Sequence, residues 1–125
     1  MTNLAPPGGG APRVLIVEDE PTIAFLLESI LENAGFAIAG VATKLAPALV
    51  IIESGVCDVA VLDANLGGVS AGPAALALRA RGVPFLVVSG YSSEQQTGAF
   101  GDALRLQKPC QPARLIEALR SILST

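Results

Sequence analysis

Polar side chains able to do chemistry follow directly on short apolar runs in this 125-residue sequence. Glu18 and Asp19 follow the run at residues 14–17, and Asp63 follows the run at residues 59–62. Two carboxylates about 4 Å apart repel by about 4 kcal/mol at an effective dielectric constant of about 20. A divalent cation would remove that repulsion, and a site built only from oxygen ligands favours Mg²⁺. We therefore predict a Mg²⁺ site that contains Glu18, Asp19 and Asp63.

Asp63, Ser89 and Lys108 have the side chains that phosphoryl transfer requires. With a metal ion neutralising the incoming phosphoryl group, Asp63 would be free to act as the nucleophile. Ser89 follows another apolar run and could donate a hydrogen bond to one phosphoryl oxygen. Lys108 could bring a positive charge to a second oxygen. These residues predict that Asp63 is phosphorylated.

Each of these residues also has a simpler interpretation. An acidic residue at a strand end, such as Glu18 or Glu20, usually caps the helix that follows. A serine such as Ser89 is more often a turn residue, and a lysine such as Lys108 is usually a solvated charge. Asp63 is harder to explain in this way, because no helix is predicted to begin within several residues of it. The simpler interpretations would have to hold at all of these positions together, which favours a shared site.

The composition limits the classes of function. The chain has no histidine, which excludes Ser-His-Asp and Cys-His catalysis, histidine-containing zinc sites and a phosphohistidine on this chain. The net charge of −3 gives no basic footprint for nucleic acid. Hydrophobic residues make up 51% of the chain, which supports a sizeable core. No apolar run approaches the roughly 20 residues that span a membrane.

The first twelve residues differ from the rest of the chain. Residues 1–12 are rich in proline and glycine and lack the features of a signal peptide, so we expect a disordered tail before a domain at residues 13–125. Cys57 and Cys110 have no metal-like spacing, and packing in a reducing compartment suits them better than a disulfide. We therefore expect a cytoplasmic protein.

Apolar periodicity predicts strands that alternate with helices. The predicted strands span residues 14–17, 36–42, 57–62, 84–88 and 103–107. The predicted helices span residues 21–34, 45–52, 73–81 and 92–100, with a last helix marked by Leu115, Leu119 and Ile122. The fourth helix is polar and weak, and a glycine-rich loop at residues 67–70 precedes the third. We expect no second domain.

Five βα units in a chain of this length predict an α/β fold with a parallel sheet covered by helices on both faces. Right-handed crossovers favour a flavodoxin-like (βα)5 three-layer sandwich with strand order 2-1-3-4-5. In such sheets, ligands bind beyond the carboxyl ends of the strands. The acidic residues, the serine and the lysine all follow strand ends, so we expect them to meet at one edge of the sheet.

With this arrangement, the sequence resembles the receiver domain of two-component response regulators. The matching pieces are VLIVEDEP, AVLDANL, FLVVSGY and LQKP, and the resemblance covers residues 13–125. It implies that Glu18 and Asp19 form the family's acidic pair, with Asp19 the more direct metal ligand. It also implies that Asp63 is the phosphoacceptor.

The same resemblance assigns the remaining site residues. The backbone carbonyl of Asn65 would contact the metal, Ser89 would be the switch hydroxyl, and Lys108 would be the family's invariant lysine. Pro109 would follow that lysine through a cis peptide bond.

The sequence departs from the family pattern at three places. Gly67 stands where the family commonly has a proline, and the loop before Gly72 is slightly longer, which predicts a more mobile segment over the site. Arg105 stands where the family usually has Tyr or Phe, three residues before the lysine, so the usual aromatic rotation is in doubt. Tyr91 either substitutes for that aromatic residue or packs against the fourth helix.

The resemblance implies a single-domain response regulator that acts as a switch and not as a classical enzyme. A histidine kinase or histidine phosphotransfer protein would phosphorylate Asp63, with limited self-catalysed transfer and hydrolysis. Output would be the binding of a downstream protein target, and the response should spread through residues 90–100. Homodimerisation through the face between the fourth and fifth helices stays open, as does an origin in a hybrid kinase.

Three other functions fit the sequence less well than this one. A pseudo-receiver would use the fold as a protein-binding module without phosphorylation, which Asp63, Ser89 and Lys108 together argue against. An aspartate-based phosphatase would need a second acid two residues after its nucleophile, where Asn65 stands. A flavin-binding protein would need a phosphate-cradling loop after the first strand, where the acidic residues 18–20 would repel phosphate.

Overall fold

The computed structural model describes residues 10–90 and 98–124, and a parallel sheet lies at its centre. The strands lie in the order β2-β1-β3-β6-β7, which is the predicted order 2-1-3-4-5. Their bounds are β1 Arg13–Val17, β2 Ala37–Ala42, β3 Val59–Asp63, β6 Phe85–Ser89 and β7 Leu104–Gln107.

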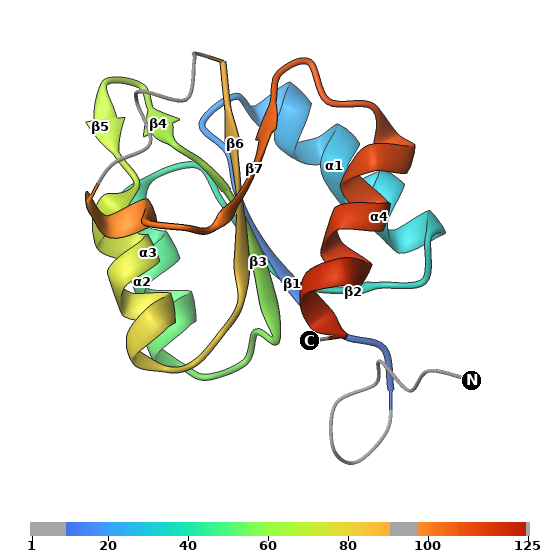
Figure 1. The fold of residues 1–125 in the computed structure, drawn as a ribbon, viewed down its shortest axis with the longest axis horizontal. Helices are drawn as coiled ribbons and strands as arrows, with labels where there is room; N and C mark the ends of the chain where they lie inside the picture. Colours follow the sequence, from blue (N-terminus) through green and yellow to red (C-terminus); the bar gives the residue numbers. More distant parts are fainter. Residues whose placement is uncertain (1–9, 91–97, 125) are drawn as a thin grey trace.

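Helices cover both faces of the sheet (Figure 1). One face carries α1 (Pro21–Asn33) and α4 (Pro112–Leu123), and the other carries α2 (Leu45–Glu53) and α3 (Gly72–Ala80). A proline lies in the first turn of α1, α3 and α4, where its missing N–H costs no helical hydrogen bond. The flavodoxin-like three-layer sandwich is confirmed.

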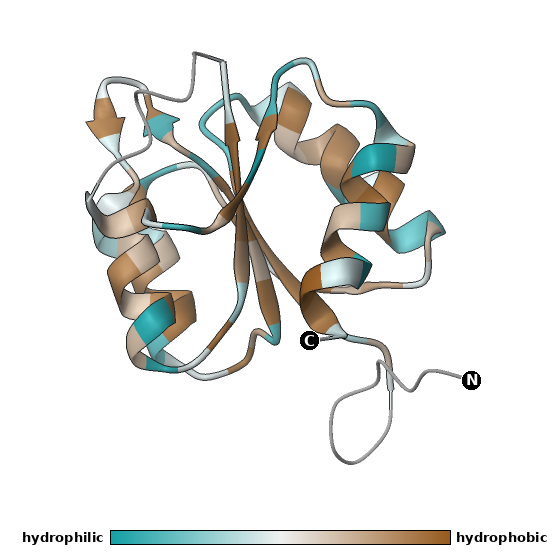
Figure 2. Ribbon diagram, in the orientation of Figure 1, coloured by the Kyte–Doolittle hydropathy of each residue, from teal (hydrophilic) through white to brown (hydrophobic). Residues whose placement is uncertain are grey.

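The three central strands are apolar on both sides because both of their faces are covered. In β1, Leu15 and Val17 pack in the core under α2 and α3, whereas Val14 and Ile16 pack in the core under α1 and α4. All four side chains are buried. Figure 2 shows the same division, with hydrophobic surfaces of the helices turned toward the sheet. The sheet is therefore fixed from both sides.

The strand ends reach one residue further than the sequence predicted. Asp63 is the last residue of β3 and pairs with Val88, and Ser89 is the last residue of β6 and pairs with Gln107. Both polar residues thus belong to the sheet, and the strand pairing positions their side chains.

The segment predicted as a glycine-rich loop is a β-hairpin. β4 (Asn65–Leu66) and β5 (Val69–Ser70) pair in antiparallel fashion around a two-residue turn. Gly67 and Gly68 have φ angles of 63° and 93°, which non-glycine residues rarely adopt. The side chain of Asn65 accepts a hydrogen bond of 2.6 Å from the N–H of Gly68. The predicted glycine-rich segment is thus the turn and second strand of a hairpin, and these local interactions close it.

The predicted fourth helix is only partly within the described residues. Residues 91–97, and with them Tyr91 and most of the predicted helix, lie outside them. The described end, η2 (Gly98–Phe100), is a single 3₁₀ turn whose Phe100 is buried. At residues 98–100 the structure therefore shows 3₁₀ and not α-helical geometry.

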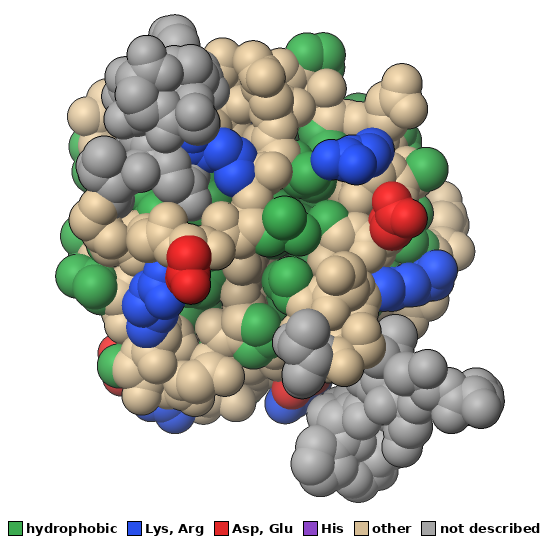
Figure 3. All heavy atoms as spheres, viewed as in Figure 1, with side chains coloured by type: hydrophobic (Ala, Val, Ile, Leu, Met, Phe, Trp, Pro, Cys, Tyr) green, Lys and Arg blue, Asp and Glu red, His purple; other side chains and the backbone are tan. Residues whose placement is uncertain are grey.

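The surface mixes charged and apolar groups. On the face shown in Figure 3, positive and negative side chains are interspersed around hydrophobic ones. Cys57 is buried in the core, as predicted, and Cys110 is partly buried. None of the helices in residues 10–90 and 98–124 is long and apolar enough to cross a membrane.

Arg13 and Asp58 join the first and third strands at the amino end of the sheet. The N–H and Nε–H of Arg13 donate to Asp58 Oδ2 at 2.8 and 3.0 Å, and Nη2 donates to Oδ1 at 3.1 Å. The hydrogen bond from the Arg13 side chain lowers the pKa of Asp58. The charged form of Asp58 therefore stabilises the fold, and this contribution is lost as the pH falls through the lowered pKa.

Asp58→Asn should lower the free energy of unfolding at pH 7 by about 1 kcal/mol, a modest value because the Arg13 side chain is 43% exposed. The difference from wild type should shrink as the pH falls below the ordinary carboxyl pKa of 3.8. Urea unfolding at several pH values measures it. Asp102→Asn is the control, because the Asp102 side chain is fully exposed. A difference independent of pH would show that the charge of Asp58 does not contribute.

Candidate functional site

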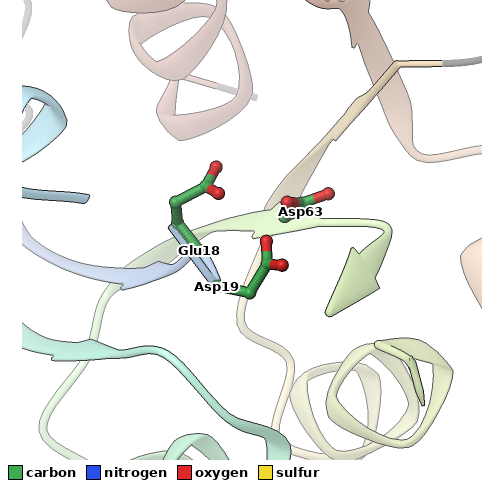
Figure 4. Close-up of side chains that lie close together, drawn as sticks. All are labelled: Glu18, Asp19 and Asp63. Atoms are coloured by element: carbon green, nitrogen blue, oxygen red, sulfur yellow. The ribbon is translucent and has the colours of Figure 1, made fainter. Parts of the chain in front are cut away.

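The three predicted acidic residues lie together at the carboxyl edge of the sheet. β1 and β3 are neighbours, with Val17 paired to Leu62, so Glu18 and Asp19 leave β1 beside Asp63. Each carboxylate offers an oxygen that lies within 4.8 Å of the others. Figure 4 shows the side chains gathered above the ends of these strands. The predicted proximity is present, and the set of oxygen ligands is one that a small divalent cation can use.

Lys108 joins this cluster from the end of β7. Its Nζ lies 2.9 Å from Asp63 Oδ2 and 3.2 Å from Glu18 Oε1. Its backbone N–H donates to the carbonyl of Ser89 at 2.8 Å, which ties the ends of β6 and β7 together. The Lys108–Pro109 peptide bond is cis, as the resemblance implied. Lys108 is thus an ion-pair partner of two buried carboxylates and not the solvated charge of the simpler interpretation.

Helix capping does not account for the acidic residues. Glu20 is the N-cap residue of α1, but its side chain makes no capping hydrogen bond. Glu18 Oε2 accepts a hydrogen bond of 3.1 Å from the N–H of Glu20, while Glu18 Oε1 faces Lys108. Asp63 Oδ1 accepts one of 3.2 Å from the N–H of Asn65. Glu18 and Asp63 are therefore held with one oxygen on the backbone and one toward the lysine.

The protonation equilibria of the carboxylates are coupled. Burial raises the pKa of Glu18 and of Asp63, although hydrogen bonds and the charge of Lys108 oppose the shift. Burial also acts to raise the pKa of Asp19, but hydrogen bonds with Asp63 and Glu18 outweigh it, and that pKa is lowered. Asp19 is therefore the carboxylate that stays ionised most readily. Lys108 keeps its proton, because its contacts with Asp63 and Glu18 outweigh burial and raise its pKa.

Ser89 and Asn65 flank Asp63 on its two sides. Ser89 is buried at the end of β6, the strand that pairs with β3. Asn65 begins the hairpin, where its side chain closes the turn and its N–H holds Asp63. Arg105 lies within β7, paired with Val87, at the position where the family usually has an aromatic residue. Tyr91 lies outside the described residues, so its predicted switch role is not tested.

Two features of the site were not predicted from the sequence. The hairpin turn approaches the acidic cluster, since a Cβ atom at Gly67 would lie 3.7 Å from Asp19 Oδ2. Two consecutive glycines between Leu66 and Val69 are a known hairpin signal and could have revealed it. The second feature is an apolar cleft of about 580 Å³ between α1 and α4, which opens beside Asp63 and Lys108. Only the packing of separate helices creates that cleft.

Removing one carboxylate from the cluster should stabilise the metal-free protein. Asp19→Asn should raise the free energy of unfolding at pH 7 by about 1 kcal/mol, because the repulsion on Glu18 and Asp63 falls. The raised pKa values of Glu18 and Asp63 mean that the wild type loses stability as the pH rises through them, so the gain should shrink as the pH falls and these two carboxylates take up protons. Chemical unfolding in EDTA measures it.

Glu20→Gln is the matched control for Asp19→Asn, because Glu20 is exposed and lies outside the cluster. An equal gain from Glu20→Gln would show that general surface charge, and not the cluster, limits stability.

The comparisons with known proteins agree with this geometry. A family model, the response regulator receiver domain, matches residues 14–120. The phyllosphere-induced regulator PhyR of Methylorubrum extorquens is 33% identical over 109 residues, which cover 84% of this chain and 41% of PhyR. The chain thus spans about two fifths of the length of that curated relative.

Solved structures of one relative match over nearly their whole length. A solution structure of SdrG from Sphingomonas melonis Fr1 is 40% identical with a TM-score of 0.78, covering 92% of this chain and 98% of that one. A solution structure of the BeF3-activated conformation of SdrG from Pseudomonas melonis Fr1 is 39% identical with a TM-score of 0.77, at the same coverage. The sequence, the fold and the acidic site of the chain described here lead to one conclusion: this chain belongs to the response regulator receiver domain family.

Proposed function

We propose that this chain is a phosphoryl-accepting signalling switch, with residues 13–125 as the receiver unit and Asp63 as the phosphoacceptor. The observation that carries the proposal is the position of Lys108 Nζ, 2.9 Å from Asp63 Oδ2 at the centre of the acidic cluster. A structural salt bridge would need one carboxylate, whereas this lysine faces two, and a third lies within 4.8 Å of them. The excess of negative charge suits a site that also takes a cation.

Asp63 is the nucleophile in this proposal. One of its carboxylate oxygens forms a new bond to the phosphorus atom of the donor. The bond from phosphorus to the donor's nitrogen or oxygen breaks, and the donor leaves with the bonding electrons. The product is an acyl phosphate on Asp63, from which water can later remove the phosphoryl group.

The residues present fit Mg²⁺, because all three side chains offer hard oxygen ligands and two of them are buried. Glu18, Asp19 and Asp63, with the backbone carbonyl of Asn65, are the proposed ligands. When bound, the metal would neutralise charge on the transferring phosphoryl group. The protein contributes the geometry, since the ends of β1 and β3 hold Glu18 and Asp63 in place.

Ser89 and Lys108 are proposed to detect the product. Phosphorylation adds roughly two negative charges and three acceptor oxygens at Asp63. Lys108 already contacts the Asp63 carboxylate, and Ser89 ends the adjacent strand. A hydrogen bond from Ser89 to one oxygen and an ion pair from Lys108 to another would shift both strand ends. The BeF3-activated structure of SdrG supports this proposal, because BeF3⁻ bound through an oxygen atom is tetrahedral and resembles a phosphoryl group.

The donor is proposed to be a histidine kinase or a histidine phosphotransfer protein. The cleft between α1 and α4 has Asp63 and Lys108 in its wall, and the rest of its lining is largely apolar. Leu26 of α1, which lines the cleft, is 57% exposed, and the preceding residue Phe25 is 70% exposed. A donor protein that reaches Asp63 could bury these side chains. Output is proposed to be the binding of a downstream protein target. Binding of a second copy of this chain is included as one form of that output.

Incubation with Mg²⁺ and acetyl phosphate should add one phosphoryl group to the wild type, measured by intact-protein mass. Asp63→Asn should gain none, and EDTA should abolish the gain in the wild type. Asp58→Asn is the matched control, because Asp58 directly precedes β3 at the end of the strand opposite Asp63 and its substitution should leave the gain intact. A folded wild type that gains no phosphoryl group from small donors or from a phosphorylated histidine phosphotransfer protein would instead support the pseudo-receiver alternative.

Lys108→Ala should still accept a phosphoryl group, but more slowly by about tenfold to a hundredfold, because a positive charge near the transferring group is lost. It should also lose the phosphorylation-dependent change in amide hydrogen exchange at residues 89–97. Lys44→Ala is the control, since Lys44 is exposed at the start of α2. If phosphorylated Lys108→Ala showed the wild-type exchange change, the lysine would not couple Asp63 to the response.

A further inference from the structure

Arg79, in the last turn of α3, binds the far end of the connection between β6 and β7. Its Nε–H donates to the carbonyl of Ala99 at 3.1 Å, and its Nη2–H donates to the carbonyl of Phe100 at 2.6 Å. The guanidinium also lies over the ring of Phe85, 5.3 Å from its centroid, at the start of β6. The ion pair with Asp102 is weaker, at 3.9 Å to a fully exposed carboxylate.

These contacts add to the local hydrogen bonds of the turn, in which the N–H of Gly101 donates to the carbonyl of Gly98 and the N–H of Ala103 donates to the carbonyl of Phe100, both at 3.0 Å. A single helical turn leaves carbonyls at its C-terminal end without helical partners. Arg79 supplies two charge-assisted hydrogen bonds from one planar group, a geometry that lysine cannot reproduce. The glycine after η2 makes room for it, because a Cβ atom at Gly101 would lie 2.7 Å from Arg79 Nη2. The side chain and the backbone around it therefore fit each other closely.

The near end of the same connection is held by the sheet. The carbonyl of Ser89 accepts the N–H of Lys108 at 2.8 Å, and the carbonyl of Val88 accepts the N–H of Ala64 at 3.0 Å. The connection thus leaves the sheet at the proposed switch residue and returns at a turn fixed to α3. We therefore expect a displacement of Ser89 to move only the residues between these two attachments, unless the hydrogen bonds of one attachment break.

We propose that Arg79 is a positioning residue that anchors η2 to α3 in both the resting and the phosphorylated state. It confines the response that begins at Ser89 to the residues before Gly98, a shorter range than the residues 90–100 expected from the sequence. This inference deepens the proposed function and rests on it, because the response is the one expected from phosphorylation of Asp63. Without the anchor, η2 is released, and the response spreads into β7 and toward Lys108.

Amide hydrogen exchange by mass spectrometry, with and without Mg²⁺ and acetyl phosphate, tests the anchor in wild type, Arg79→Gln and Arg81→Gln. Arg81 is the matched control. It directly follows α3, the helix whose last turn holds Arg79, but its guanidinium pairs with Glu53 at 3.5 Å and not with η2. In resting Arg79→Gln, residues 98–102 should exchange about tenfold faster than in the other two proteins. On phosphorylation, its exchange change should extend into residues 104–107, whereas in wild type and Arg81→Gln it should end before residue 98.

Gly101→Asn provides a second route to the same state without altering Arg79. Asn tolerates the left-handed φ of 55° at this position, but its Cβ would displace the guanidinium. It should reproduce the exchange pattern of Arg79→Gln. The anchor is overturned if Arg79→Gln matches Arg81→Gln, if Gly101→Asn keeps residues 98–102 protected, or if phosphorylation of the wild type itself releases them.

Failure of the anchor and failure of the proposed function give different results. The resting-state comparison needs no phosphoryl group, so equal exchange of residues 98–102 in all variants overturns the anchor alone. A wild type whose mass does not change with the donor overturns the proposed function, and with it the confinement of the response. A phosphorylated wild type whose exchange change crosses Gly98 overturns the confinement while leaving Asp63 as the phosphoacceptor.

Discussion

The ion cluster formed by Glu18, Asp63 and Lys108 is the constraint on which the rest of the structure depends. The two carboxylates are 3% and 6% exposed, and burying them without a partner would cost several kcal/mol. Lys108 Nζ offsets part of that cost from within 3.2 Å of both. With Asp19 nearby, negative charge still exceeds positive charge. Lys108 therefore stabilises the buried carboxylates only in part, and the remaining negative charge suits the proposed cation site.

This cluster can form only if three separate strand ends meet. β1 and β3 pair directly, β7 enters through β6, and every one of these strands runs parallel. Side chains packed on both faces hold the central strands, so the sheet cannot easily deform at the site. A change of charge at Asp63 therefore acts on the segments that leave the sheet, not on the sheet itself.

Two such segments flank the site and are built differently. The hairpin after β3 is closed locally by its glycine turn and by Asn65, and it lies against Asp19. At its described end, the connection after β6 makes two local hydrogen bonds of 3.0 Å and is also joined to α3 through Arg79. The first segment lies beside the acidic residues, and in our proposal the second sets where a displacement of Ser89 stops.

The sequence by itself determined the strand order and the acidic residues that meet in the candidate site. Apolar runs that end in Glu18, Asp63 and Ser89 predict their meeting, because parallel strands place their carboxyl ends at one edge. It did not determine the ion pairs of Lys108, the apolar cleft or the contact of Arg79 with η2. Those depend on side chains 45 residues apart for Lys108 and Asp63, and 20 and 21 apart for Arg79 and its two carbonyls. Periodicity reports which face of an element is buried, and only tertiary packing decides which distant groups meet there.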